Sequence, residues 1–151
     1  MYFDEKVIIL NGSAKTKEEA ITDIAKLMLT KENVNDKFLE NVLKRELVYP
    51  TGLLVNGVGI AIPHTDSEYV KKSQLGFMSL KTPVVFNEMG TLDKEVKVSL
   101  IFMLALKEAH EQLSMLQQLI EMFQNEEVIS SLLKITDEKE FIQLMSNQNL
   151  D

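Results

Sequence analysis

His64 stands at the end of an apolar run, in the stretch Val58 to Asp66 that reads Val-Gly-Ile-Ala-Ile-Pro-His-Thr-Asp. Pro63 has no backbone N–H and pushes Ile62 towards an extended conformation, so a strand should end just before the histidine. Open α/β sheets bind ligands at the carboxyl ends of their strands. An imidazole has a pKa near neutrality, so part of it is a neutral nucleophile at cellular pH. The stretch therefore predicts a rigidly mounted imidazole in a histidine-centred anion site.

Two plainer interpretations of His64 stay open at this point. A histidine that ends a strand can simply hydrogen-bond nearby backbone. It could also bind a metal ion together with Asp66, although one histidine and one aspartate make a poor metal site. The sequence has no cysteine, which excludes disulfides, thiolate nucleophiles and cysteine-based metal sites.

His110 is the other of the two histidines and falls near the expected start of a long helix. Helix N-termini offer unpaired N–H groups and a positive dipole end, which suit a phosphate. A second imidazole there could donate a hydrogen bond to an anion held on His64. The alternative is a partly exposed helix residue at the edge of an apolar face that begins at Leu113.

Arg45 and Thr51 flank the entry of the chain into this region. Beside a phosphoryl group they would supply a planar charged donor and a neutral donor. Otherwise Arg45 would be a solvated surface residue, and Thr51 would only fix a turn. The sequence contains no glycine-rich phosphate loop, Ser-His-Asp order or nucleotide fingerprint.

Composition restricts the class of protein further. The chain has 151 residues, of which 45% are apolar and 26% charged, as in an ordinary globular domain. The net charge of −7 argues against binding to nucleic acid or anionic membranes and favours partners with basic patches. The first residues lack a signal-peptide pattern, and no apolar run approaches the ~20 residues of a membrane span. We therefore expect a cytoplasmic protein.

Hydrophobic periodicity predicts the elements that must position these residues. Asn56-Gly57 between two apolar runs predicts a hairpin. Thr16 and Glu19 have capping-box spacing, and Asn35 is placed to cap a second helix. Predicted strands are Val7–Leu10, Leu53–Val55, Val58–Ile62, Leu75–Leu80, Val84–Phe86 and a strand beginning at Val96. Predicted helices are one after Thr16, one after Asn35, Glu108–Gln124 (with Leu113, Leu116, Leu119, Ile120 and Phe123 as its apolar face), Val128–Leu133 and Glu138–Met145. The fold class is α/β, a single domain with a mixed sheet.

Several blocks of this sequence closely resemble the EIIA family of the bacterial phosphoenolpyruvate-dependent sugar phosphotransferase system, in its fructose/mannitol/galactitol type. They are Arg45-Glu46, Pro50-Thr51-Gly52, Asn56-Gly57 and Gly59-Ile60-Ala61-Ile62-Pro63-His64, in the order of the family. An apolar strand from Val96 and then His110 follow, so the resemblance covers almost the whole chain. It implies a mixed β-sheet flanked by helices, with residues 1–151 as a single EIIA phosphocarrier domain.

The resemblance also implies a function. His64 would be phosphorylated by the carrier HPr and would pass the phosphoryl group to a cysteine of EIIB, which phosphorylates the sugar as EIIC imports it. His110 matches the second active-site histidine of mannitol-type members, where it would stabilise the phosphoryl group. Arg45 matches an arginine near their site, and Arg45 and Thr51 would both be supporting residues of the site. Such a relay requires no cofactor, metal, nucleic acid or membrane insertion.

Within the family, the stretch Tyr49–Leu53 looks most like the galactitol branch. Two alternatives remain: a regulatory EIIA of the nitrogen-related branch, which controls partner proteins through the same phosphohistidine, and a metal-dependent hydrolase built on His64, Asp66 and His110.

Overall fold

A mixed β-sheet forms the centre of the molecule in the computed structural model, which describes residues 2–150. Within these residues the sheet has five strands in the order β1-β4-β5-β3-β2. Their bounds are β1 Ile8–Gly12, β2 Gly52–Val55, β3 Val58–Ala61, β4 Gln74–Asn87 and β5 Glu95–Ala105. The neighbours β1/β4 and β3/β5 are parallel, whereas β4/β5 and β2/β3 are antiparallel. This confirms the predicted α/β class with a mixed sheet.

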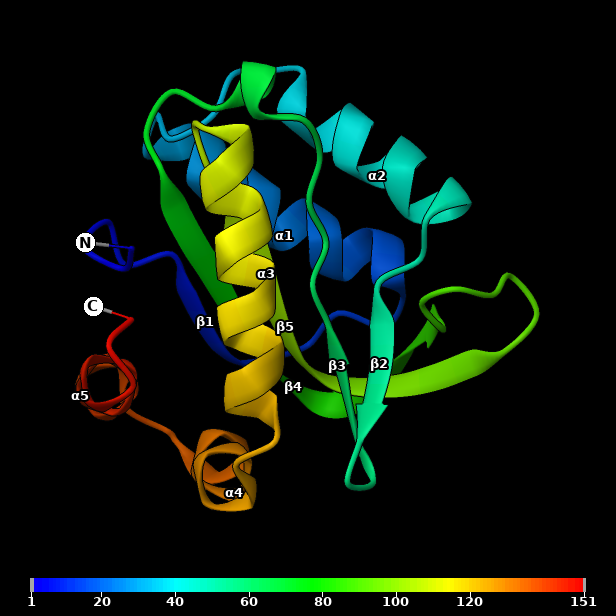
Figure 1. Cartoon of the computed structure of the whole chain (residues 1–151), viewed down its shortest axis with the longest axis vertical. Helices are drawn as coiled ribbons and strands as arrows, with labels where there is room; N and C mark the ends of the chain where they lie inside the picture. Colours follow the sequence, from blue (N-terminus) through cyan, green and yellow to red (C-terminus); the bar gives the residue numbers. More distant parts are fainter. Residues whose placement is uncertain (1, 151) are drawn as a thin grey trace.

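Helices cover both faces of the sheet (Figure 1). Helices α1 (Lys17–Thr30) and α2 (Phe38–Val48) pack on one face. Helices α3 (Ala109–Phe123), α4 (Glu126–Lys134) and α5 (Glu138–Asn147) pack on the other. A short 3₁₀ turn, η1 (Ser67–Tyr69), lies between β3 and β4. Over residues 2–150, none of the helices is long and apolar enough to cross a membrane.

Strand β5 shows how the two cores are built. Leu100 and Phe102 point into the core under α3, α4 and α5, while Ile101 and Met103 point into the core under α1 and α2. This alternation follows from the two-residue period of a strand. Each such fully buried side chain contributes roughly 1.5–3 kcal/mol relative to an exposed one. Both faces of β5 are buried, which makes it a rigid neighbour for β3, the strand that leads to His64.

Two local predictions are confirmed. Asn56 and Gly57 both have positive φ, 49° and 82°, as a type I′ hairpin turn between β2 and β3 requires. Thr16 is the N-cap of α1, and its hydroxyl oxygen accepts a hydrogen bond from the backbone N–H of Glu19 at 3.1 Å.

Two other local predictions were wrong. The separate strands predicted on either side of Pro83 are one strand, β4, with an irregularity between Ser79 and Val84. Pro83 is tolerated because β1 pairs with β4 only as far as Leu80, so the missing N–H is not needed there. Asn35 does not cap α2: its side chain accepts from the N–H of Lys37 at 3.0 Å in a turn before the helix begins at Phe38.

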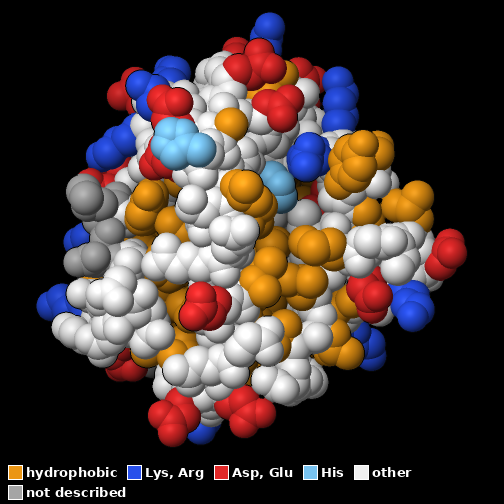
Figure 2. All heavy atoms as spheres, viewed as in Figure 1, with side chains coloured by type: hydrophobic (Ala, Val, Ile, Leu, Met, Phe, Trp, Pro, Cys, Tyr) orange, Lys and Arg blue, Asp and Glu red, His pale blue; other side chains and the backbone are white. Residues whose placement is uncertain are grey.

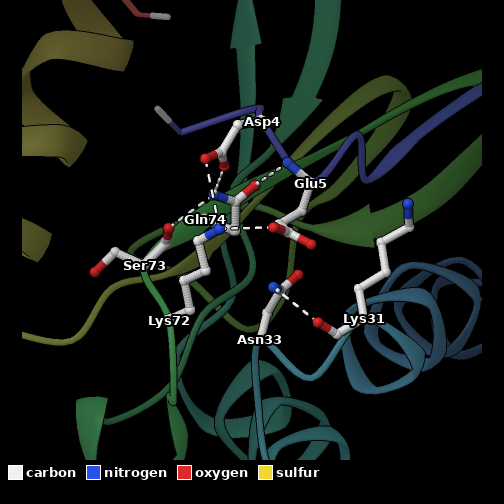
Figure 3. A network of polar contacts seen from close by, with 7 residues as sticks. All are labelled: Asp4, Glu5, Lys31, Asn33, Lys72, Ser73 and Gln74. Atoms are coloured by element: carbon white, nitrogen blue, oxygen red, sulfur yellow. Dashed lines mark hydrogen bonds and ion pairs between the residues drawn. The ribbon is translucent and has the colours of Figure 1, made fainter.

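A polar network fastens the segment before β1 to the start of β4 (Figure 3). The Gln74 side chain accepts from the Glu5 N–H at 3.1 Å and donates to the carboxylate of Asp4. The ammonium group of Lys72 forms ion pairs with Asp4 at 3.4 Å and Glu5 at 2.6 Å. Exposed ion pairs of this kind contribute little to stability, so the buried Gln74 is the stronger anchor.

Candidate active site

His64 is held in one orientation directly after β3. Its side chain is 8% exposed, and its Nδ1 lies 2.8 Å from the carbonyl oxygen of Ile62. A carbonyl only accepts, so Nδ1 carries the proton and Nε2 keeps its lone pair in the neutral ring. Burial lowers the pKa of His64 below 6.5, although the hydrogen bond to Ile62 opposes this effect. At pH 7 the ring is therefore a neutral nucleophile whose available atom is Nε2.

The backbone around His64 is anchored on both sides of the histidine. The carbonyl oxygen of Pro63 accepts from the N–H of Leu104 in β5 at 3.1 Å. The carbonyl oxygen of Thr65 accepts from the side-chain amide of Gln112 in α3 at 3.0 Å. The strand itself ends at Ala61, one residue earlier than predicted, because the N–H of Ile62 pairs with a side chain instead of a neighbouring strand.

That side chain is Thr51, which is 3% exposed. Its hydroxyl oxygen accepts from the Ile62 N–H at 3.2 Å and donates to Oε1 of Glu46 at 2.9 Å. Oε2 of Glu46 accepts from the Thr51 N–H at 2.7 Å. Burial raises the pKa of Glu46 to about 7, although both hydrogen bonds from Thr51 act in the opposite direction. The Thr51 hydroxyl therefore holds the backbone of Ile62, two residues before His64, and its proton is donated to Glu46.

Arg45 precedes Glu46 near the end of α2, and its side chain lines the same hollow as His64. Its guanidinium carbon lies 5.1 Å from the ring centre of Tyr49, and its Nε is buried without a hydrogen-bond partner among the described residues. Arg45 and His64 line a shallow hollow of about 200 Å³. The other lining residues are Thr65, Asp66, Ala109, Gln112, Leu113 and Leu116. An anion in this hollow would meet the arginine charge and the Nε2 side of the imidazole.

His110 is not part of the lining of this hollow. It is exposed in the first turn of α3, and no hydrogen bond joins it to His64 within residues 2–150. On the face drawn in Figure 2, the two histidines appear as separate areas. The wall formed by α3 consists of positions 109, 112, 113 and 116, which share one helical face, whereas position 110 is turned away from it.

The predicted apolar face of α3 was only partly right. Leu113 is 61% exposed and borders the hollow, and Ile120 is 38% exposed. Met115 and Met122 are buried in their place, so the helix is rotated relative to the prediction. This rotation also brings Gln112 to the site, a residue that the sequence analysis missed. Position 112 shares a helical face with Leu113 and Leu116, which is the signal that could have found it.

The described residues do not bring His64, Asp66 and His110 together as metal ligands. Within residues 2–150 no group of three histidine, aspartate or glutamate side chains could hold a metal ion. Asp66 and His110 are exposed, whereas His64 is buried. The geometry thus disfavours the metal-dependent hydrolase alternative.

Fold and site together define an α/β protein in which a buried, neutral histidine and an arginine line one shallow hollow. Residues 1–148 match the family described as "Phosphoenolpyruvate-dependent sugar phosphotransferase system, EIIA 2", and the chain belongs to that family. Members of this family are phosphotransferase components, which carry phosphoryl groups on a histidine in sugar uptake.

Individual relatives support this assignment. The chain is 29% identical over 121 residues to the galactitol-specific EIIA component of Escherichia coli K12, covering 80% of each chain. The mannitol EIIA of Escherichia coli, solved in complex with phosphorylated EIIB, superposes with a TM-score of 0.76 at 26% identity, over 95% of this chain and 96% of the other. The nitrogen regulatory protein IIA-Ntr of Neisseria meningitidis superposes with a TM-score of 0.74 at 26% identity, over 93% and 94%.

Proposed function

We propose that this protein accepts a phosphoryl group from phospho-HPr on Nε2 of His64 and passes it to a cysteine of EIIB in the cytoplasm. EIIB would then phosphorylate a sugar or sugar alcohol as EIIC imports it. The observation that carries the proposal is the 2.8 Å hydrogen bond from His64 Nδ1 to the Ile62 carbonyl, which leaves Nε2 unprotonated. Residues 1–151 would act as one phosphocarrier domain.

The bond changes need no proton transfer from this protein. The lone pair of Nε2 attacks phosphorus while the P–N bond of the donor phosphohistidine breaks, and the donor leaves as a neutral imidazole. In the second transfer a cysteine thiolate attacks phosphorus, and the bond to Nε2 breaks. Phosphoryl transfer depends mainly on positioning and on stabilising the charge of the equatorial oxygens.

Stabilisation of those oxygens is assigned to Arg45 and the first turn of α3. The Arg45 Nε is buried without a partner among the described residues and lies in a side chain that lines the hollow. The N-cap of α3, Glu108, makes no side-chain capping hydrogen bond, so backbone N–H groups of the first turn remain for an anion. His110 lies in that turn and could swing towards a bound phosphoryl group.

The surface around the hollow suits a transient protein partner. Leu113, which lines the hollow, is 61% exposed. Tyr49, whose ring centre lies 5.1 Å from the guanidinium carbon of Arg45, is 62% exposed, and Figure 2 shows further hydrophobic side chains on the drawn face. A modest apolar surface of this kind is typical of short-lived complexes. The mannitol relative solved with phosphorylated EIIB supports EIIB as one such partner. The net charge of −7 would steer a partner with a basic rim, as we propose for HPr.

A galactitol-like substrate is supported by the similarity to the galactitol-specific EIIA of Escherichia coli and by the stretch Tyr49–Leu53. The likeness to IIA-Ntr supports a second candidate, a regulator that uses the same phosphohistidine. Deletion of the gene followed by growth on single sugars separates the two. Loss of growth on one sugar alcohol supports transport, and unchanged growth on all of them supports regulation.

The phosphorylation site is tested with phosphoenolpyruvate, enzyme I and HPr. Intact mass should show one added phosphoryl group on the wild type and none on His64→Ala. The ³¹P spectrum of the wild-type product should be that of an Nε2 phosphohistidine. Phosphorylation of His64→Ala at the wild-type rate would refute the site, and an Nδ1 product would refute the assigned nucleophilic atom.

A further inference from the structure

We propose that Glu46 is a positioning residue for His64, acting through Thr51 and the backbone of Ile62. The inference deepens the proposed function and rests on it for the kinetic part. Glu46 does not line the hollow and cannot contact the phosphoryl group from its place behind Thr51. Its effect on the reaction would therefore be indirect.

The hydrogen bonds between Glu46, Thr51 and Ile62 each have a defined direction. Above its pKa of about 7, Glu46 is ionised and both of its oxygens only accept, so the Thr51 N–H and the Thr51 O–H must both point at it, at 2.7 and 2.9 Å. The hydroxyl proton is then committed, and the lone pairs of the Thr51 oxygen are turned to the Ile62 N–H at 3.2 Å. The carboxylate thus makes the Thr51 hydroxyl oxygen the acceptor for the Ile62 N–H.

Ile62 connects Thr51 to the imidazole of His64. Ile62 stands between β3 and Pro63, where regular strand pairing has ended, so its N–H has no ladder partner. Thr51 supplies the missing acceptor and fixes the orientation of Ile62. The carbonyl of the same residue receives His64 Nδ1 at 2.8 Å. A shift of Ile62 would therefore move the group that selects the tautomer of His64.

A contact that only closed the turn between α2 and β2 would not need a carboxylate at position 46. Glu46 is 4% exposed, and burying a carboxylate is costly unless it is fully hydrogen-bonded. A neutral side chain could close the turn between α2 and β2 at lower cost. The two acceptor oxygens of Glu46 explain why a carboxylate stands here. One accepts from the Thr51 N–H and the other from the Thr51 O–H, and both contacts are needed to fix the direction of the Thr51 hydroxyl.

The test that does not depend on function is nuclear magnetic resonance of the two imidazoles in the unphosphorylated protein. In the wild type, His64 should show a single tautomer with a proton on Nδ1 that exchanges slowly with water. In Glu46→Gln, Glu46→Ala and Thr51→Val this exchange should be at least about tenfold faster, because the Ile62 carbonyl is no longer fixed. Exposed His110 is the internal reference and should not change.

The kinetic test measures phosphoryl acceptance by the same variants. Small displacements of a reacting group can cost up to about 100-fold, so we expect roughly 10- to 100-fold slower transfer in Glu46→Ala and Thr51→Val. Glu46→Gln, which keeps one acceptor, should fall between these variants and the wild type. Thr51→Ser should recover most of the rate that Thr51→Val loses.

Val42→Ala is the matched control. Val42 is fully buried one turn earlier on the same side of α2, and its truncation should destabilise the helix without touching Thr51. It should leave both the Nδ1 proton and the transfer rate as in the wild type. Wild-type exchange of the Nδ1 proton in the Glu46 and Thr51 variants, or an equal change in Val42→Ala, would overturn the proposal. A wild type that takes up no phosphate would refute the proposed function, while the imidazole spectra would still decide the role of Glu46.

Discussion

The side-chain amide of Gln112 in α3 donates a hydrogen bond of 3.0 Å to the carbonyl oxygen of Thr65, the residue after His64. The contact joins two segments that are far apart in sequence at the wall of the hollow. It holds the residue after His64, while the Thr51 hydroxyl accepts from the N–H of Ile62 before it, so the backbone is anchored on both sides of the histidine in sequence.

Gln112→Ala should slow phosphoryl acceptance by about three- to tenfold, because the Thr65 carbonyl loses a neutral hydrogen bond of roughly 1 kcal/mol. Gln118→Ala is the control on the same helix, since the Gln118 amide donates to the carbonyl of Asn149 at 3.4 Å and not to the loop after His64. Rapid-quench kinetics with phospho-HPr measure both. Equal rates in the two variants would show that the contact with Thr65 does not matter for transfer.

Arg45→Ala should reduce both acceptance and onward donation by roughly 10- to 100-fold, because a charged donor to the phosphoryl oxygens is lost. Arg45→Lys should recover part of the rate by restoring the charge without the planar fork. The neighbouring exposed Lys44, changed to alanine, controls for the loss of surface charge. A rate within twofold of wild type in Arg45→Ala would show that Arg45 is an ordinary surface residue with no role in phosphoryl transfer.

His110→Ala should accept phosphate at a near-normal rate but donate it to EIIB about tenfold more slowly. The side chain is exposed and does not line the hollow, so we expect it to contact the phosphoryl group only after transfer. Its exposure also predicts an unchanged melting temperature. Normal donation by this variant would exclude His110 from the relay, and a lowered melting temperature would indicate a structural role.

Gly59→Ala should destabilise the protein by about 2 kcal/mol or more, because an added Cβ would lie 1.9 Å from the backbone oxygen of Lys97 in β5. Strand β3 would have to move away from β5, and His64 would move with it. Gly57→Ala is the comparison: it meets no atom within 4 Å but has φ +82°, so a cost of about 1 kcal/mol is expected. Urea denaturation ranks the two, and a smaller loss for Gly59→Ala would contradict the strand packing described above.

Glu46 should make the stability of the protein depend on pH. Its pKa is raised from 4.5 to about 7 by burial, with Thr51, Lys17 and Arg45 opposing the shift. The folded state therefore binds the proton more tightly, and this contribution is fully present below pH 4.5 and is lost as the pH rises through about 7. The difference is on the order of 3 kcal/mol.

The measurement compares wild type with Glu46→Gln by urea denaturation at pH 5 and pH 8. His64 acts in the opposite direction, because its lowered pKa gives stability above pH 6.5 that is lost as the pH falls through the folded-state pKa. Both proteins contain His64, and because Glu46→Gln would itself alter the surroundings of His64, the same pair is also compared in a His64→Ala background, where the effect of His64 is absent. The wild type should gain stability relative to Glu46→Gln at pH 5, and a difference that is the same at both values would contradict the raised pKa.

Local chemistry was sufficient for much of the fold and for the position of His64. The Asn56-Gly57 turn, the Thr16 cap and the alternation at the start of β5 follow from steric and hydrogen-bonding rules that act over a few residues. Pro63 cannot take part in regular strand pairing, so the histidine after it lies beyond the carboxyl end of β3. These features were predictable because neighbouring residues determine them.

The remaining features depend on how distant elements pack. The rotation of α3 was decided by the core, which buries Met115 and Met122 and thereby turns Leu113 and Gln112 to the hollow. Periodicity in a helix rich in leucine and methionine fits more than one such rotation.

Glu46 is a residue of the site whose position could not be predicted from the sequence. A glutamate near the end of an amphipathic helix is ordinarily a solvated residue, and only the folded structure buries it beside Thr51, the residue before β2. The sequence by itself pointed to His64, the residue that we propose as the nucleophile, because that choice depends on residue type and on the end of a strand. The tertiary structure decided which side chains hold it, because hydrogen bonds between α2, the β2–β3 hairpin and α3 exist only once those elements have packed.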